Sequence, residues 1–130
     1  MQIVTDSSAD LSSEQKVGLE IHCVPLTFIL DGKSYRCGED IQPEEFYQLL
    51  KSTNSFPHTS QPSAGEFAEV YRKLAVTDPE ILSFHISSGL SGTINSARLG
   101  AEMASEAKVT FIDTKTLSGA QGWQIEAAAR

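Results

Sequence analysis

The sequence has 130 residues, of which 40% are hydrophobic, and it carries a formal net charge of −7. A chain of this length can bury one ordinary core, and it has no run of about 18 consecutive apolar residues, so a membrane span is excluded. The acidic balance also argues against a nucleic-acid-binding surface, because phosphate binding depends on clustered Lys and Arg.

The ends of the chain and its cysteines carry further information. The opening segment MQIVTD has the pattern of a strand and lacks an export signal, so we expect a cytoplasmic protein. Cys23 and Cys37 do not form a disulfide framework or a zinc motif with the three scattered histidines, and we expect reduced thiols, no metal and no cofactor. The last segment has helical composition and no C-cap, which favours one domain cut from a longer protein.

The first third of the chain alternates strand and helix patterns. A strand over residues 2–5 comes first, and the capping-box pair Ser12 and Gln15 then opens a helix. The β-rich segment IHCVPLTFIL follows, and the Asp-Gly pair after it predicts a β-hairpin near residues 21–36.

The remainder continues this alternation. Pro43 is placed as a first helical residue, a loop is expected over residues 52–62, and Ser63 with Glu66 forms a second capping box. The later predicted elements are, in order, the strand ILSFHI, the helix SGTINSARLGAEMASEA, the strand VTFID and a last helix. The alternation predicts a single α/β domain over residues 1–130, with a mostly parallel sheet flanked by helices.

Four loops share a chemistry that points to a ligand. In open parallel sheets, ligands bind at the carboxyl ends of the strands, where loops lead into helices. The loops that occupy or reach this position are rich in hydroxyl groups and glycine, and they are TDSSAD, HTSQPS, SSGLSGT and DTKTLSGAQG.

The loop SSGLSGT has the outline of an anion site. Gly89 and Gly92 allow a ligand to approach the backbone, and the helix that starts near Ser91 offers unpaired N–H groups. The loop lacks the Lys of a phosphate-binding GxxxxGK[ST] motif, and Arg98 lies too far into the helix to replace it. A single carboxylate therefore suits it better than a polyphosphate, although the same residues also suit a plain turn and cap.

The loop HTSQPS and the question of a nucleophile complete the reading of single residues. Ser63 is expected to serve as an N-cap, which leaves Thr59, Ser60 and Gln61 free to donate hydrogen bonds. No GxSxG elbow is present, and His85 is expected to be a half-buried structural histidine. A triad of Ser91 with His58 or His85 and Asp6 or Asp113 is the weaker alternative.

The segments TDSSADL, TSQPS, SSGLSGTINSA and IDTKTLSGAQG, in this order and spacing, resemble the signature segments of the DegV family, bacterial proteins that bind fatty acids. The resemblance extends over essentially the whole chain. It covers the N-terminal half of the family pattern, since members are about twice as long and have a second α/β domain. Thr114 stands where the family typically has Ser and keeps the hydroxyl group.

The resemblance implies a carrier that is not itself an enzyme. A long-chain fatty acid would lie in an apolar tunnel, and Thr59 and Ser91 would hold its carboxylate. Some members are the binding subunit of a fatty acid kinase, so a separate kinase is an expected partner. Further residues expected to line the pocket are Asp6, Ser7, Ser60, Ser88, Gly92 and Ser118.

Two other functions and one structural question stay open at this stage. The first alternative is an enzyme in its own right, a phosphotransferase or hydrolase that uses Ser91 or an Asp. The second is a structural or regulatory interaction domain. Leu26, Phe28 and Ile86 lie on β-like segments, and the pattern does not separate core positions from tunnel positions.

Overall fold

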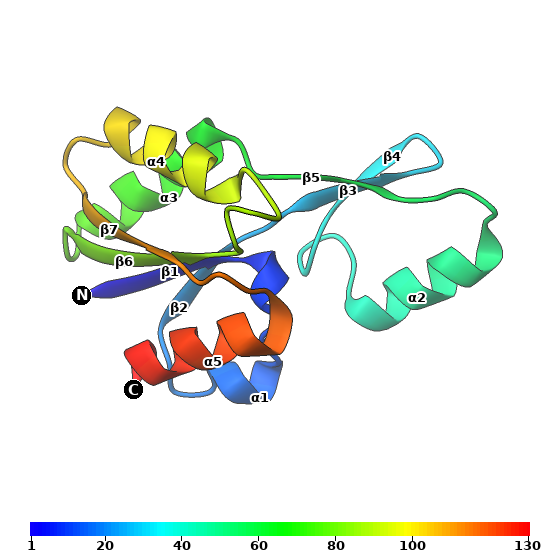
Figure 1. Ribbon diagram of the computed structural model, residues 1–130, viewed down its shortest axis with the longest axis horizontal. Helices are drawn as coiled ribbons and strands as arrows, with labels where there is room; N and C mark the ends of the chain where they lie inside the picture. Colours follow the sequence, from blue (N-terminus) through cyan, green and yellow to red (C-terminus); the bar gives the residue numbers. More distant parts are fainter.

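The computed structural model describes residues 1–130 and contains two separate sheets (Figure 1). The larger sheet has four parallel strands in the order β2-β1-β6-β7. Its strands are β1 (Gln2–Asp6), β2 (Ile21–Val24), β6 (Glu80–His85) and β7 (Lys108–Asp113). The predicted α/β fold with a parallel sheet is confirmed.

Helices cover both faces of the parallel sheet (Figure 1). Because strand side chains alternate between faces, Ile81 packs with α3 and α4 while Phe84 packs with Ile125 of α5 on the opposite face. None of the helices combines the length and the apolar character needed to cross a bilayer. The helices around this sheet are the 3-10 helix η1 (Ser7–Ala9), α1 (Ser13–Lys16), α3 (Ala64–Ala75), α4 (Thr93–Met103) and α5 (Ser118–Ala129).

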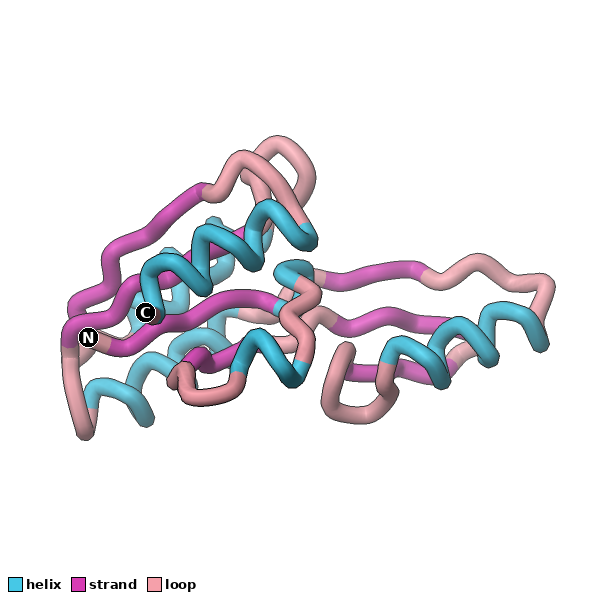
Figure 2. The backbone as a smooth tube through the Cα atoms, turned by 90° about the horizontal axis from the view of Figure 1, so that it is seen from below, coloured by secondary structure: helices cyan, strands magenta, loops and turns pink.

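The second sheet is antiparallel and projects from the end of the molecule opposite the two termini (Figures 1 and 2). It has the order β4-β3-β5, and the helix α2 (Pro43–Ser52) packs on it. The predicted hairpin is confirmed as β3 and β4, whose turn has positive φ at Asp31 (51°) and Gly32 (76°). The strands are β3 (Thr27–Leu30), β4 (Lys33–Arg36) and β5 (His58–Ser60).

One expectation about local structure was wrong, and another is now more precise. The segment IHCVPLTFIL is β-rich as expected, and it breaks around Pro25 into β2 of the parallel sheet and β3 of the antiparallel sheet. Proline lacks the N–H that a continuous ladder requires. The segment 52–62 is not all loop, since β5 pairs with the free edge of β3. The capping boxes at Ser12 and Ser63 are both present as predicted.

The order of the parallel strands defines where a ligand site belongs. The chain passes from β1 to β2 on one side and later returns to β6 on the other side of β1. The loops that leave the carboxyl ends of β1 and β6 therefore diverge at this switch point, the position where open α/β sheets bind their ligands. Asp6 and His85 are the last residues of these two strands.

Candidate functional site

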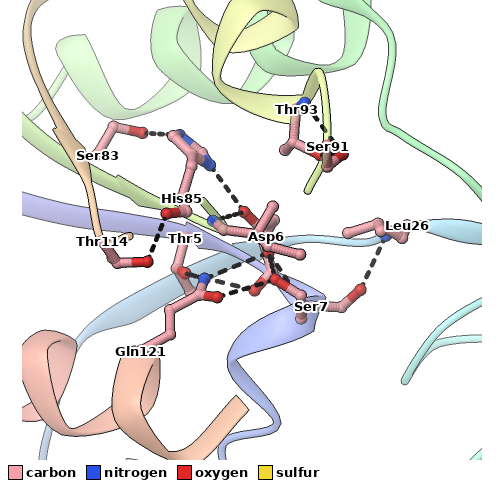
Figure 3. A network of polar contacts seen from close by, with 12 residues as sticks. Thr5, Asp6, Ser7, Leu26, Ser83, His85, Ser91, Thr93, Thr114 and Gln121 are labelled. Atoms are coloured by element: carbon pink, nitrogen blue, oxygen red, sulfur yellow. Dashed lines mark hydrogen bonds and ion pairs between the residues drawn. The ribbon is translucent and has the colours of Figure 1, made fainter. Parts of the chain in front are cut away.

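Asp6 is the centre of a buried polar network at the switch point (Figure 3). Its Oδ2 accepts a hydrogen bond from the Ile86 amide at 3.1 Å and lies 3.0 Å from His85 Nδ1. Its Oδ1 accepts from the Ser8 amide at 3.0 Å and from Gln121 Nε2 at 3.3 Å. One carboxylate thus joins the ends of two strands to η1 and α5.

The network continues from His85 into the core. His85 Nε2 lies 2.8 Å from Ser83 Oγ, which lies 2.9 Å from the Tyr71 hydroxyl. An ionised Asp6 only accepts, so His85 Nδ1 donates to it; with Nε2 as the acceptor of Ser83, Ser83 in turn accepts from Tyr71. Each group in the chain is then satisfied, with one direction of donation.

The expectation of a half-buried His85 was wrong, because the side chain is fully buried. Helix α3 covers this end of β6, and the Phe67 ring meets the imidazole edge-on with 5.2 Å between centroids. Ser83, His85 and Asp6 follow the order of a nucleophile, base and acid, but all three are 0% exposed. A substrate cannot reach Ser83, so this array serves structure.

Burial and hydrogen bonding shift the pKa of the Asp6 carboxyl in opposite directions. Burial alone would raise the pKa of the Asp6 carboxyl, because it disfavours the charged form. Hydrogen bonds from His85, Ser8 and Ile86 outweigh burial, and the pKa lies below its ordinary value. Burial also raises the pKa of the Tyr71 hydroxyl, which therefore remains a donor. The network holds one ionised carboxylate.

The two predicted carboxylate ligands belong to different sheets. Thr59 is exposed on β5 and pairs with Phe28 of β3. Ser91 precedes α4, where its Oγ lies 2.8 Å from Thr93 Oγ1 and accepts from the Thr93 amide at 3.2 Å (Figure 3). The Ser91 hydroxyl is therefore engaged with Thr93 at the start of α4, and the binding roles of both residues stay predictions.

A pocket of about 670 Å³ lies between the two sheets. This volume is in the range of roughly 300–1,000 Å³ that is typical of small-molecule sites. Leu26 and Phe28 line the pocket, and Phe28 is also a core residue of the antiparallel sheet, whereas Ile86 is buried outside the lining. The other apolar side chains of the lining include Leu11, Ile21, Ile41, Phe46 and Tyr47.

The structure brings together only some of the residues predicted to line the pocket. Asp6, Ser7 and Thr59 line the same pocket. The others lie outside its lining: they are Ser60, Ser88, Ser91, Gly92 and Ser118.

The residues outside the lining have local partners of their own. Ser88 donates from its amide to Asp113 at 3.2 Å, which ties the loop after β6 to the end of β7. Ser60 Oγ donates to the Gln61 carbonyl at 3.4 Å. Ser118 begins α5 with φ of 53°.

Sequence reasoning missed two contributions to the site. Gln121 was given no role, although it is fully buried and a buried amide needs a polar partner. Ser7 Oγ accepts from the Leu26 amide at 2.9 Å and so joins η1 to the segment between β2 and β3 (Figure 3). A contact between residues this far apart is fixed by the fold and leaves no local pattern.

The parallel sheet, its switch point and the adjoining pocket define a class of protein, an α/β domain with a pocket of ligand size beside the carboxyl ends of its strands. The chain belongs to the DegV family: the model of that family, described as "Uncharacterised protein, DegV family", matches residues 1–130.

Relatives of two lengths match the chain. A DegV domain-containing 15.5 kDa protein of Staphylococcus aureus is 44% identical over 124 residues, which cover 95% of this chain and 87% of that protein. A DegV domain-containing protein of Listeria innocua is 40% identical over 129 residues, which cover 99% of this chain and 46% of that protein. The chain thus spans less than half the length of the longer relative.

Solved structures with the same fold include a DegV protein of Bacillus subtilis, described as a fatty acid binding protein. It has a TM-score of 0.94 and 34% identity, with 98% of this chain and 45% of that chain covered. A DegV family protein of Thermus thermophilus, described by its fatty acid binding, has a TM-score of 0.87 and 40% identity, with 98% and 45% covered.

Proposed function

We propose that this protein is a carrier that binds a long-chain fatty acid without changing it chemically. The observation that carries the proposal is the pocket between the sheets, which is apolar along Leu26, Phe28 and Phe46 and has hydroxyl groups at Ser7 and Thr59. An amphiphile with a long tail and a small polar head matches this division. Relatives described as fatty-acid-binding proteins support it.

The tail supplies most of the affinity in this proposal. Burying about fourteen methylene groups at about 0.8 kcal/mol each contributes roughly 11 kcal/mol before the costs of association. Aromatic and aliphatic side chains such as Phe28 and Ile41 provide the apolar wall. Tail burial has no direction, so it does not by itself orient the ligand.

The head group supplies orientation. Each hydrogen bond from Thr59 or Ser91 to a carboxylate contributes about 1.5–3 kcal/mol net, and part of this offsets the desolvation of the charge. The N-terminus of α4 adds the positive end of the helix dipole, which favours a single negative charge. Asp6 already accepts hydrogen bonds from the end of β6, from η1 and from α5, which disperse its charge near the pocket.

We further propose that the carrier presents the carboxylate to a separate fatty acid kinase. The loop SSGLSGT has no lysine for a polyphosphate, so the nucleotide would bind to the partner. In a two-domain carrier, residues beyond this domain would cover the remainder of the tail, as the length of the relatives supports. With a cognate kinase, Ser91→Ala should reduce acyl-phosphate formation more than fatty acid binding; equal acyl-phosphate formation would contradict this.

The test of the carrier is to purify the protein encoded by the complete reading frame, extract it with organic solvent and identify bound lipid by mass spectrometry. We expect a stoichiometric long-chain fatty acid, with reduced retention after Thr59→Ala and Ser91→Ala. Thr110→Ala and Ser105→Ala, which change exposed residues of the same types, are the matched controls. Absence of lipid together with no uptake of added palmitate would refute the carrier, and turnover of palmitate by the protein alone would favour an enzyme.

A further inference from the structure

The relative position of Thr59 and Ser91 depends on how the two sheets are joined. Thr59 is part of the antiparallel sheet, whose core is the separate cluster of Phe28, Leu30 and Ile41. Ser91 belongs to the loop between β6 and α4 of the parallel sheet. The two cores are distinct clusters, so a contact outside them must fix the alignment of these hydroxyl groups.

Gln61 makes such a contact at the junction of the sheets. It lies two residues after Thr59 and two before Ser63, the N-cap of α3, where the chain passes from β5 to the parallel sheet (Figure 1). Its Nε2 donates to Ser96 Oγ at 2.8 Å. Ser96 is only 8% exposed and lies on α4, just after the turn that contains Ser91.

Gly92 provides the space that this side chain occupies. A Cβ added at Gly92 would lie 2.6 Å from Gln61 Oε1, closer than real Cβ atoms come, and 3.1 Å from its Nε2, so the Gln61 side chain would have to move. The backbone at Gly92 has φ of −79°, a value that any residue adopts, so its conformation does not require glycine. The side chain of Gln61 is therefore what the absence of a Cβ accommodates.

We infer that Gln61 is a positioning residue that holds β5 on the first turn of α4, so that Thr59 and Ser91 face one carboxylate. The inference rests on the proposed function for its ligand and extends it to a residue that need not touch that ligand. The Gln61 side chain packs against Gly92, and Ser96 is the hydrogen-bond partner of Gln61.

The binding experiment uses the protein encoded by the complete reading frame and palmitate as the probe. Gln61→Ala should weaken palmitate binding about tenfold, the loss expected when one hydrogen bond to a charged group is misaligned. Thr59→Ala should weaken it similarly, and the double variant should be no weaker than Thr59→Ala, because Gln61 acts through Thr59. Gln48→Ala, at an exposed glutamine of α2, is the control and should bind as the wild type does. Additive losses would overturn the inference.

Gly92→Ala provides an independent variant of the same contact. The added methyl group should displace Gln61 and weaken binding as Gln61→Ala does, and it should have no further effect in the Gln61→Ala background. If Gly92→Ala weakens binding equally in both backgrounds, Gly92 acts on the ligand directly and not through Gln61.

A measurement without lipid separates this inference from the proposed function. In NMR spectra of the lipid-free protein, the Gln61 side-chain amide should show a nuclear Overhauser effect to Gly92 Hα. Gln61→Ala should lower the backbone order parameters of residues 58–60 and leave those of β6 unchanged. Unchanged order at residues 58–60 would overturn the inference, whereas failure of the wild type to bind palmitate would refute only the carrier.

Discussion

The two sheets of this domain differ in how they are covered. The parallel sheet has helices on both faces, and in β6 it buries Ile81, Ser83, Phe84 and His85. The antiparallel sheet is covered by α2, which contains no fully buried residue. The pocket lies between a heavily packed wall and a lightly packed one, so the second wall is expected to open at a lower free energy. The fixed polar network and the adaptable apolar wall are thus in different parts of the molecule.

The largest effect should come from breaking the small core of the antiparallel sheet. Phe28 is 4% exposed, stacks on Tyr35 with 5.0 Å between ring centroids and meets Phe46 edge-on at 4.7 Å. Phe28→Ala should lower the free energy of unfolding of this sheet by about 3–5 kcal/mol. We expect a loss of this size to unfold the sheet locally. Hydrogen exchange should show loss of protection in β3 to β5 while β1 and β6 stay protected.

Ile81→Ala, in the core beneath α3, is the matched variant for that experiment. It should lower the protection of all strands, because the parallel sheet carries the global stability of the domain. If Phe28→Ala also lowers protection in β1 and β6, the two sheets unfold as one unit and the distinction between the walls is wrong.

The next effect concerns the polar network of the parallel sheet. Asp6→Asn turns one acceptor oxygen into a donor that faces either His85 and Ile86 or Ser8 and Gln121. A buried donor without a partner should lower the free energy of unfolding by about 3 kcal/mol, as measured by urea denaturation. Asp10→Asn, at an exposed position, should change it little; a loss below about 1 kcal/mol for Asp6→Asn would contradict the role of the network.

A smaller effect should appear where α3 and α4 meet. A Cβ at Gly100 would lie 2.6 Å from Phe67 Cβ and 2.7 Å from the Ala64 carbonyl oxygen. Gly100→Ala should therefore push the two helices apart and lower the free energy of unfolding by about 1–3 kcal/mol. Gly119→Ala in α5 meets no atom within 4 Å and should be neutral or stabilising by up to about 1 kcal/mol. Equal thermal unfolding of both variants would show that this face of the parallel sheet is not tightly packed.

The sequence predicted most of the parallel sheet and its helix starts because these depend on local signals. Apolar periodicity and the capping boxes at Ser12 and Ser63 are contained in a few neighbouring residues. β5 was missed because three exposed residues carry no apolar pattern, and their strand character comes from pairing with β3. Strand pairing of this kind is a tertiary effect.

The sequence predicted which loops form the candidate site, but it did not predict which side chains contact one another there. The hydroxyl-rich loops after β1, β6 and β7 and around β5 were identified because topology places such loops together. The roles of His85, Gln121 and Gln61 depend on partners 79, 115 and 35 residues away. Distances of that kind are set by how the elements pack, and one sequence does not record them.

The smallest expected effect is on stability in acid. It depends on the charge of Asp6, which belongs to the parallel sheet, and so it distinguishes that sheet from the antiparallel one. The pKa of Asp6 lies below its ordinary value of 3.8 in the folded protein. A lowered pKa stabilises the fold fully above the unfolded value, and this contribution is lost as the pH falls through the folded value. The difference in unfolding free energy between wild type and Asp6→Asn should therefore be constant above about pH 5 and shrink below pH 3.8.

Other carboxyl groups with lowered pKa values, at Asp31, Asp78, Asp113 and Glu126, titrate in both proteins and cancel in that difference. Hydrogen exchange measured across the same pH range should assign the loss to β1 and β6, since Asp6 joins those two strands. β3 is joined to this region by the hydrogen bond from the Leu26 amide to Ser7 Oγ. It should therefore keep its protection from hydrogen exchange until the parallel sheet itself opens. A difference that stays constant down to about pH 2 would mean that the pKa of Asp6 is the same in the folded and unfolded states, and that the network does not favour the anion.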